Sequence, residues 1–203
     1  MKALGSFLLA SGLIGMSAPA SAQDYPFEEW ASLWLRTCGS LDAAFAVIDD
    51  PEAHGWSNAN ADADESAARI IEVATMNTQA SADDAKLTGL YVLRQSTNSG
   101  RALAAFQEVQ FVDEPDSYLL ACTVYDTSAP AMTVDELARL SAERPFKDVS
   151  ANGLTIIEWS EGTEGSGRFK MTAGSIPQDH PGAALLQSGL VLKTQYVFSE
   201  TSE

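Results

Sequence analysis

The stretch FEEWASLWLRTCGSLDAAFAVIDDPEAHGW, residues 27–56, decides how the remainder of the chain is expected to fold. Its apolar residues recur at alternating steps of four and three, which places them along one face of a helix. Gly39 and Ser40 interrupt this pattern, so the sequence predicts either one helix or two short helices that meet there. We expect the apolar face to cover a β-sheet formed by the rest of the chain. Its members are Phe27, Ala31, Trp34, Cys38, Leu41, Phe45 and Ile48.

Local signals mark where the second of these helices begins and where a further turn ends. Ser40 is placed to cap a helix that runs to about residue 48. Asp50 followed by Pro51 predicts a cap and the first position of another short turn, which Gly55 would close. A tryptophan beside such a helix end is usually a core residue. We therefore expect three aromatic core anchors in this stretch, namely Trp34, Phe45 and Trp56.

Residues 1–22 have the order of features that is typical of a signal peptide. Lys2 supplies a positive charge, and residues 7–16 form an apolar run too short to span a bilayer. The small residues before position 23 fit a cleavage site, so we expect cleavage after Ala22 and a single domain over residues 23–203. The alternatives are an uncleaved anchor or a buried N-terminal helix. Cleavage predicts a periplasmic or secreted protein that makes no stable membrane insertion afterwards.

The charge balance excludes some classes of partner. The chain carries 12 Lys and Arg residues against 28 Asp and Glu residues, a net charge of −16. A protein this acidic repels phosphate backbones and anionic lipid surfaces, so we expect no nucleic-acid partner. A solvated acidic shell that keeps an exported protein soluble is the simplest interpretation of the excess acid.

In the middle of the chain, the sequence pattern predicts one element that is either a helix or a strand. A series of strands and one clear helix follow it. Residues 67–76 are ambiguous between the two structures, and Asp64 could cap a helix there. A clearer helix is predicted over residues 133–144, where Thr133 and Glu136 form a capping box and Pro145 ends the helix. Alternating apolar runs bounded by turn signals predict strands at residues 87–95, 102–111, 118–125, 154–160, 168–173 and 190–198.

These elements predict an α+β fold. Short turns between successive strands favour a largely antiparallel sheet of about six strands. We expect the N-terminal and mid-chain helices to pack together on one side of this sheet.

The polar residues 57–66 resemble a calcium-binding loop in part. Their oxygen-bearing side chains alternate as the early ligands of such a loop do. The sixth position, however, is Ala63 instead of the glycine that the sharp turn needs, and the twelfth is Arg69 instead of a glutamate. An ordinary surface loop is therefore the favoured interpretation, and we expect no metal site. The alternating residues are Asn58, Asn60, Asp62 and Asp64.

The chain lacks the usual signatures of catalysis and of cofactor binding. Two histidines leave few candidates for a catalytic triad and are too few for a histidine-rich metal site, and no glycine-rich phosphate loop follows a strand. Paired carboxylates remain the possible catalytic groups, although acidic clusters are usually solvated. We therefore predict no catalytic residue and no cofactor. The densest acidic groups are Asp49, Asp50 and Glu52 with His54, and Glu158 with Glu161 and Glu164.

The two cysteines predict a disulfide bond between Cys38 and Cys122. An exported chain reaches an oxidising compartment, and both residues lie on apolar faces that the fold would bring together. The alternative is two buried free thiols. The order of the two cysteines with Gly55 and Trp56 between them resembles uncharacterised small exported bacterial proteins with a Cys…Gly-Trp…Cys pattern. That resemblance implies no activity.

Two functions are consistent with these observations. The first is a non-enzymatic binding or interaction module of the bacterial envelope, whose partner is an envelope protein or a small ligand. The second is a carboxylate-based periplasmic hydrolase. The absence of histidine, thiol and phosphate-binding motifs favours the binding module.

Overall fold

A computed structural model describes residues 24–80, 83–141, 145, 147–164, 167–181, 183 and 188–199. The predicted signal peptide, residues 1–22, therefore lies outside the described residues. The helices are α1 (Phe27–Cys38), α2 (Leu41–Asp49), α3 (Glu65–Ala80) and α4 (Val134–Leu137), with 3₁₀ turns η2 (Glu52–His54) and η3 (Ala138–Leu140). The strands are β1 (Ser57–Asn58), β2 (Ala85–Ser96), β3 (Arg101–Phe111), β4 (Ser117–Asp126), β5 (Lys147–Ala151), β6 (Leu154–Glu164), β7 (Gly167–Ile176) and β8 (Gly189–Ser199).

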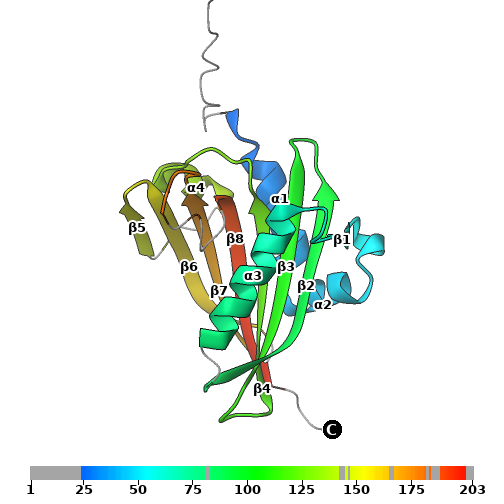
Figure 1. Ribbon diagram of the computed structural model, residues 1–203. Helices are drawn as coiled ribbons and strands as arrows, with labels where there is room; N and C mark the ends of the chain where they lie inside the picture. Colours follow the sequence, from blue (N-terminus) through cyan, green and yellow to red (C-terminus); the bar gives the residue numbers. More distant parts are fainter. Residues whose placement is uncertain are drawn as a thin grey trace, which may run out of the picture.

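The strands form one antiparallel sheet in the order β1-β2-β3-β4-β8-β7-β6-β5 (Figure 1). The α+β class and the antiparallel pairing are as predicted, but the described part of the chain has eight strands instead of about six. The two additional strands lie at the edges of the sheet. β1 is two residues long, and all five residues of β5 are exposed. Neither has a buried face, so neither carries the apolar alternation by which a strand is recognised in a sequence.

The predicted caps of the N-terminal stretch are present. The chain forms two helices, which separate at Gly39 and Ser40, and the Ser40 Oγ accepts a hydrogen bond from the Ala43 backbone N–H at 3.0 Å. The Asp50 carboxylate caps the next turn, and Gly55 ends it in the left-handed conformation, with φ of 78°. These short-range contacts explain why the element bounds here follow the sequence closely.

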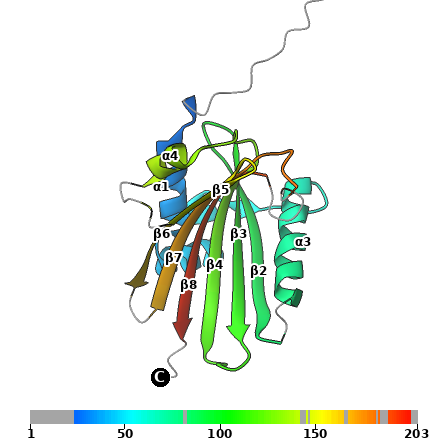
Figure 2. The ribbon, with the colours of Figure 1, turned by 90° about the vertical axis from the view of Figure 1, so that its left-hand side faces the viewer.

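One face of the sheet is covered by α1, α2 and α4 (Figure 2). Trp34 and Trp56 are buried there, with only 1% and 3% of their surface exposed. Phe45 is half-buried instead of buried, because the inner face of α2 is formed by Ala44 and Val47. The Phe45 ring lies edge-on to Phe198 of β8, with 5.7 Å between the ring centroids.

The predicted disulfide joins the last residue of α1 to the middle of β4. The Cα atoms of Cys38 and Cys122 are 5.5 Å apart, and both residues are fully buried. Two hydrogen bonds tie α1 to β8 beside the bond. The Tyr196 hydroxyl donates to the Cys38 backbone oxygen at 2.6 Å. The Trp34 indole N–H donates to the Thr194 hydroxyl at 3.1 Å.

The expectation that all helices pack on one side of the sheet is wrong, because α3 covers the opposite face (Figure 2). Alternate residues of β3 point to opposite faces of the sheet. Ala104 and Phe106 pack in the cluster under α1, whereas Leu103 and Ala105 pack with Ile70 of α3. β3 is thus apolar on both faces because each face has its own helical cover.

Residues 67–76, which are ambiguous in the sequence, belong to α3. The Asp64 Oδ1 accepts hydrogen bonds from the backbone N–H groups of Ser66 and Ala67, so Asp64 is the predicted cap. Its other carboxylate oxygen lies 3.0 Å from the Arg101 guanidinium at the start of β3. This ion pair holds the first turn of α3 over β3.

The helix predicted at residues 133–144 is shorter than expected. Its capping box is present, since the Thr133 hydroxyl and the Glu136 carboxylate each bond the other's backbone N–H. The chain then tightens into η3 and becomes extended at Ser141. Leu137 and Leu140 are both buried, and a spacing of three residues suits a 3₁₀ turn as well as an α-helix. None of the helices in the described ranges is long and apolar enough to cross a membrane.

Removing the disulfide should lower the stability of the protein strongly. The bond closes a loop with a sequence separation of 84, and the loop-closure model assigns such a loop about 4–5 kcal/mol. We expect the Cys38→Ala/Cys122→Ala double variant to lose about this much free energy of unfolding in urea titrations. Wild-type protein treated with dithiothreitol should behave as the variant does. Equal stability of the oxidised wild type and the variant would contradict the prediction.

Two aromatic deletions in the helical layer should differ in their effect. Trp34→Ala removes a fully buried ring and should lower the free energy of unfolding by about 3–5 kcal/mol. Phe45→Ala removes a half-buried ring and one aromatic pair, so we expect a loss of about 1–2 kcal/mol. Leu35→Ala is the control, because Leu35 is 51% exposed. A larger loss for Phe45→Ala than for Trp34→Ala would be the opposite result.

Candidate functional site

A cleft of about 150 Å³ lies between α3 and the sheet, and we call it the α3 cleft. The helix packs over β2 and β3 at its start, so the cleft opens where its inner face extends towards β4 and β8. Alanines at positions 105 and 121 form part of the floor, and their short side chains leave the space unfilled. The lining residues are Ile70, Val73 and Ala74 of α3 with Ala105, Gln107, Ala121, Thr123, Tyr125, Val191 and Lys193 of the sheet.

Most of the polar groups in the α3 cleft are satisfied by one another. The Gln107 side-chain amide donates to the Thr78 hydroxyl of α3 at 2.7 Å. This contact also holds the second half of the helix against β3. Thr123 hydrogen-bonds the Tyr125 hydroxyl, and burial raises the pKa of Tyr125 to about 12. Tyr125 therefore stays neutral at physiological pH and offers no charge to a ligand.

Lys193 differs from these groups because it has no ion-pair partner among the described residues. It is half-buried on β8, where its cross-strand neighbours are Thr123 of β4 and Thr172 of β7. Burial lowers the pKa of the Lys193 ammonium, and the positive charge of Lys170 lowers it further. A partly desolvated cation of this kind is stabilised when an anion binds beside it.

The other two lysines on this face share a single carboxylate. Glu158 of β6 pairs with Lys170 at 2.9 Å and with Lys147 at 3.7 Å. The hydrogen bond from Lys170 is the main reason that the pKa of Glu158 is lowered. In register across the sheet, Lys193, Thr172, Glu158 and Lys147 form a polar row from the α3 cleft to the edge strand β5. Lys193 is the member of that row without a counter-ion in the described part of the chain.

The predicted acidic clusters do not form a shared site. Asp49, Asp50, Glu52 and His54 lie exposed around η2, and Asp50 caps that turn. Glu158 is half-buried on the other half of the sheet. The side chains of Glu161 and Glu164 lie outside the described residues. A general acid needs a carboxyl group that stays protonated, whereas the lowered pKa of Glu158 keeps this one ionised.

The side chains of the calcium-like loop serve the local fold. The Asn60 side-chain oxygen accepts a hydrogen bond from the Asp62 backbone N–H, and Asp64 caps α3. Arg69, at the position where a calcium loop has a glutamate, pairs with Glu72 one turn further along the helix. Within the described ranges, no three His, Cys, Asp or Glu side chains come close enough to share a metal ion.

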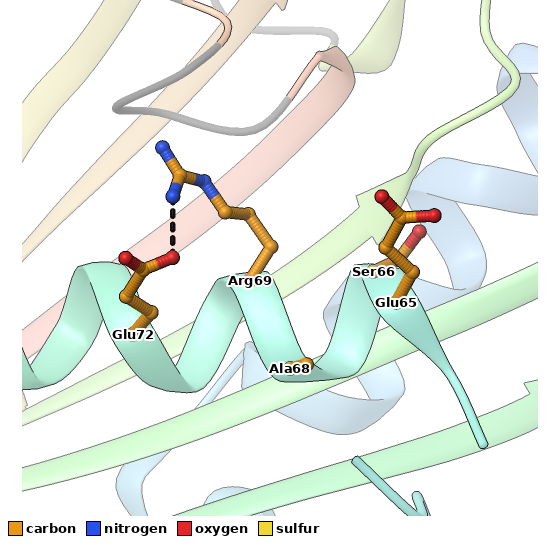
Figure 3. Close-up of a pocket in the computed structure, with 5 residues that line it drawn as sticks. All are labelled: Glu65, Ser66, Ala68, Arg69 and Glu72. Atoms are coloured by element: carbon orange, nitrogen blue, oxygen red, sulfur yellow. Dashed lines mark hydrogen bonds and ion pairs between the residues drawn. The ribbon is translucent and has the colours of Figure 1, made fainter. Parts of the chain in front are cut away.

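A larger hollow beside α3 is less suited to ligand binding than the α3 cleft. It measures about 480 Å³, but its described lining residues come from one helix and include a single apolar side chain, Ala68 (Figure 3). Arg69 and Glu72 neutralise each other there. Figure 3 shows that Glu65 and Ser66 extend from the helix without converging on this pair. Ligand sites usually combine apolar walls with a few convergent polar groups, so we do not assign this hollow a ligand.

His54 and Trp56 line a third hollow, of about 220 Å³, between η2 and α1. The buried side-chain oxygen of Gln95 faces no hydrogen-bond partner in the described part of the chain. Arg36 and His54, which also line the hollow, are exposed. Solvent therefore reaches this place, and a water molecule suits the Gln95 oxygen.

The α3 cleft was not predicted from the sequence. In the sequence, Lys193 alternates with the apolar residues of the predicted strand 190–198, a pattern that indicates a side chain facing water. Only the presence of α3 over the same face turns that position into the wall of a cleft. Comparison with models of known protein families, with curated proteins and with solved structures finds no match for the chain.

The Glu158 ion pairs should produce a pH-dependent contribution to stability. A carboxyl group whose pKa is lowered by folding stabilises the protein above its unfolded pKa, about 4.3, and loses this effect as the pH falls through the folded pKa. We expect Glu158→Gln to lower the free energy of unfolding by about 1–2 kcal/mol at pH 7. Exposed Lys147 should add little to this value, because solvent screens it.

The measurement is urea unfolding of the wild type and the variant at pH 7 and at pH 3. The difference between the two proteins should shrink at the lower pH. Glu114→Gln, in the exposed turn before β4, is the matched control and should leave the stability unchanged at both values. An equal loss for Glu158→Gln at pH 7 and pH 3 would show that the ion pairs are not its cause.

Proposed function

We propose that the protein is a non-enzymatic binding module of the bacterial envelope and that it holds a small ligand in the α3 cleft. The observation that carries the proposal is the pairing of an apolar space with one uncompensated charge. The cleft has apolar walls on both the helix and the sheet, and Lys193 reaches it from β8. Ligand pockets commonly have this composition, in which apolar walls supply affinity and few polar groups supply orientation.

The cleft favours a small ligand over an envelope protein as the partner. Stable protein interfaces bury about 800 Å² on each partner, and they are broad and fairly flat. The α3 cleft is instead a space of about 150 Å³ between a helix and a sheet. An apolar cavity of about this volume accepts a molecule the size of benzene. We therefore expect a ligand with one ring or a short aliphatic chain.

Binding is favoured over carboxylate-based hydrolysis by the state of the acidic residues. A hydrolase of this kind needs two carboxyl groups that flank the substrate and differ in protonation. Among the acids that the sequence suggested, Asp50 caps a turn and Glu158 is occupied by two lysines. The described lining of the α3 cleft contains no carboxylate.

We propose that the protein acts outside the cytoplasm, in the periplasm or as a secreted protein. The disulfide between Cys38 and Cys122 is compatible with an oxidising compartment. The signal-like features of residues 1–22 support the same location. The test is cell fractionation combined with the intact mass of the isolated protein, which should begin at Gln23. A cytoplasmic protein that retains residues 1–22 would contradict the proposal.

Filling the cleft should abolish ligand binding. We expect the neutral one-ring compound benzyl alcohol to shift the amide NMR signals of residues that line the α3 cleft, such as Thr123 and Val191. Ala121→Leu adds a larger side chain to the floor and should remove these shifts. Ala151→Leu is the control, because Ala151 is exposed on β5 and far from the cleft in the order of strands.

Far-UV circular dichroism and thermal unfolding show whether the filled variant is folded. If Ala121→Leu does not fold, Ala74→Val tests the same space from the α3 side. Shifts that occur away from the cleft, or that persist in the folded filled variant, would overturn the proposed function.

A further inference from the structure

We infer that the ligand of the α3 cleft is a small monocarboxylate, whose carboxylate lies at the Lys193 ammonium and whose apolar part lies under α3. This inference rests on the proposed function and adds the chemical class of the ligand. It follows from the charge of the site, from the arrangement of its walls and from the size of the space. The charge of the site restricts the charge of the ligand, the walls restrict the arrangement of its polar and apolar parts, and the space restricts its size.

The positive charge of Lys193 favours an anionic ligand. Acidic residues outnumber basic ones 28 to 12 in this chain, yet no described carboxylate pairs with Lys193. Lys170 and Lys147, on the same face of the sheet, share Glu158. A half-buried ammonium group is destabilised by its lost hydration, and an anion at hydrogen-bonding distance offsets that loss. On this face of the sheet, the carboxylate of a ligand therefore takes the place of the protein carboxylate that Lys193 lacks.

A single negative charge fits better than several. One lysine supplies one unit of positive charge at the cleft, and the adjacent Lys170 is already paired with Glu158. The net charge of the protein is −16, so a ligand with several negative charges would be repelled by the remainder of the surface. Phosphate-binding sites usually combine several cationic or backbone N–H donors. The cleft therefore favours a monocarboxylate over a phosphate.

The walls separate a polar end from an apolar end. Lys193 begins the polar row on β8, the lining strand that is nearest to β7, and its cross-strand neighbour Thr123 lines the cleft from β4. Ile70 and Val73 of α3 and Ala105 of β3 lie on the helix side of the cleft. A ligand with a charged group at one end and an apolar body at the other matches this division. The volume of about 150 Å³ limits the body to one ring or a short chain.

The test compares benzoate with benzyl alcohol, which has a similar body and no charge. Both are titrated by isothermal calorimetry into the wild type, into Lys193→Met and into Lys170→Met. Methionine keeps much of the length of the lysine side chain and removes its charge. Because a charge-assisted hydrogen bond strengthens binding by about ten- to a hundredfold, we expect wild-type protein to prefer benzoate by about that factor.

Lys193→Met should remove this preference, because benzoate loses its charged partner. Lys170→Met should retain most of the preference, because Lys170 is paired with Glu158 and does not line the cleft. The thermal stability of Lys193→Met should equal or exceed that of the wild type, since the variant removes a partly desolvated charge. If Lys193→Met does not fold, Lys193→Gln tests the same loss of charge with a polar side chain.

The possible failures can be told apart. Equal affinities for benzoate and benzyl alcohol in the wild type would overturn the monocarboxylate inference and leave the proposed binding function intact. A preference for benzoate that persists in Lys193→Met and Lys193→Gln would also overturn it. Failure of both compounds to bind wild-type protein would overturn the proposed function and this inference with it.

Discussion

The disulfide between α1 and β4 is the constraint on which the arrangement of the molecule depends. It fixes the end of the first helix at the middle of the sheet, where β4 pairs with β3 on one side and β8 on the other. The hydrogen bonds from Tyr196 to Cys38 and from Trp34 to Thr194 extend the same attachment to β8. Because α1 is held over these central strands, the first face of the sheet is closed by α1, α2 and α4.

The second face is closed only in part, and this incomplete cover creates the candidate site. α3 is held at its start by the Asp64–Arg101 ion pair and near its end by the contact of Gln107 with Thr78. Both of these contacts are with β3, and β2 and β3 are the strands against which α3 mainly packs. The α3 cleft lies at the border between the covered strands and the uncovered ones. Lys193 stands on that border, where it lines the cleft and is the first member of the polar row.

The candidate site depends on residues from distant parts of the chain. Lys193 belongs to β8, whereas the cross-strand neighbours that place it in the polar row belong to β4 and β7. The ion pairs of Glu158 with Lys147 and Lys170 likewise need the register of three strands. An alternating pattern shows that a residue lies on one of two faces, but it does not show what covers that face. The sequence therefore indicated a strand around Lys193 and gave no sign of a cleft.

By itself, the amino-acid sequence determined the features that depend on neighbouring residues or on simple periodicity. The caps at Ser40, Asp50 and Thr133 need only a few adjacent residues, and the central strands follow from alternation. The Cys38–Cys122 bond was predicted from the signal-like segment, the even number of cysteines and the apolar positions of both residues. Only the tertiary structure decided the two edge strands, the position of α3 on the opposite face and the surroundings of Lys193. These features arise from packing between segments far apart in the chain, for which local propensity and periodicity contain no information.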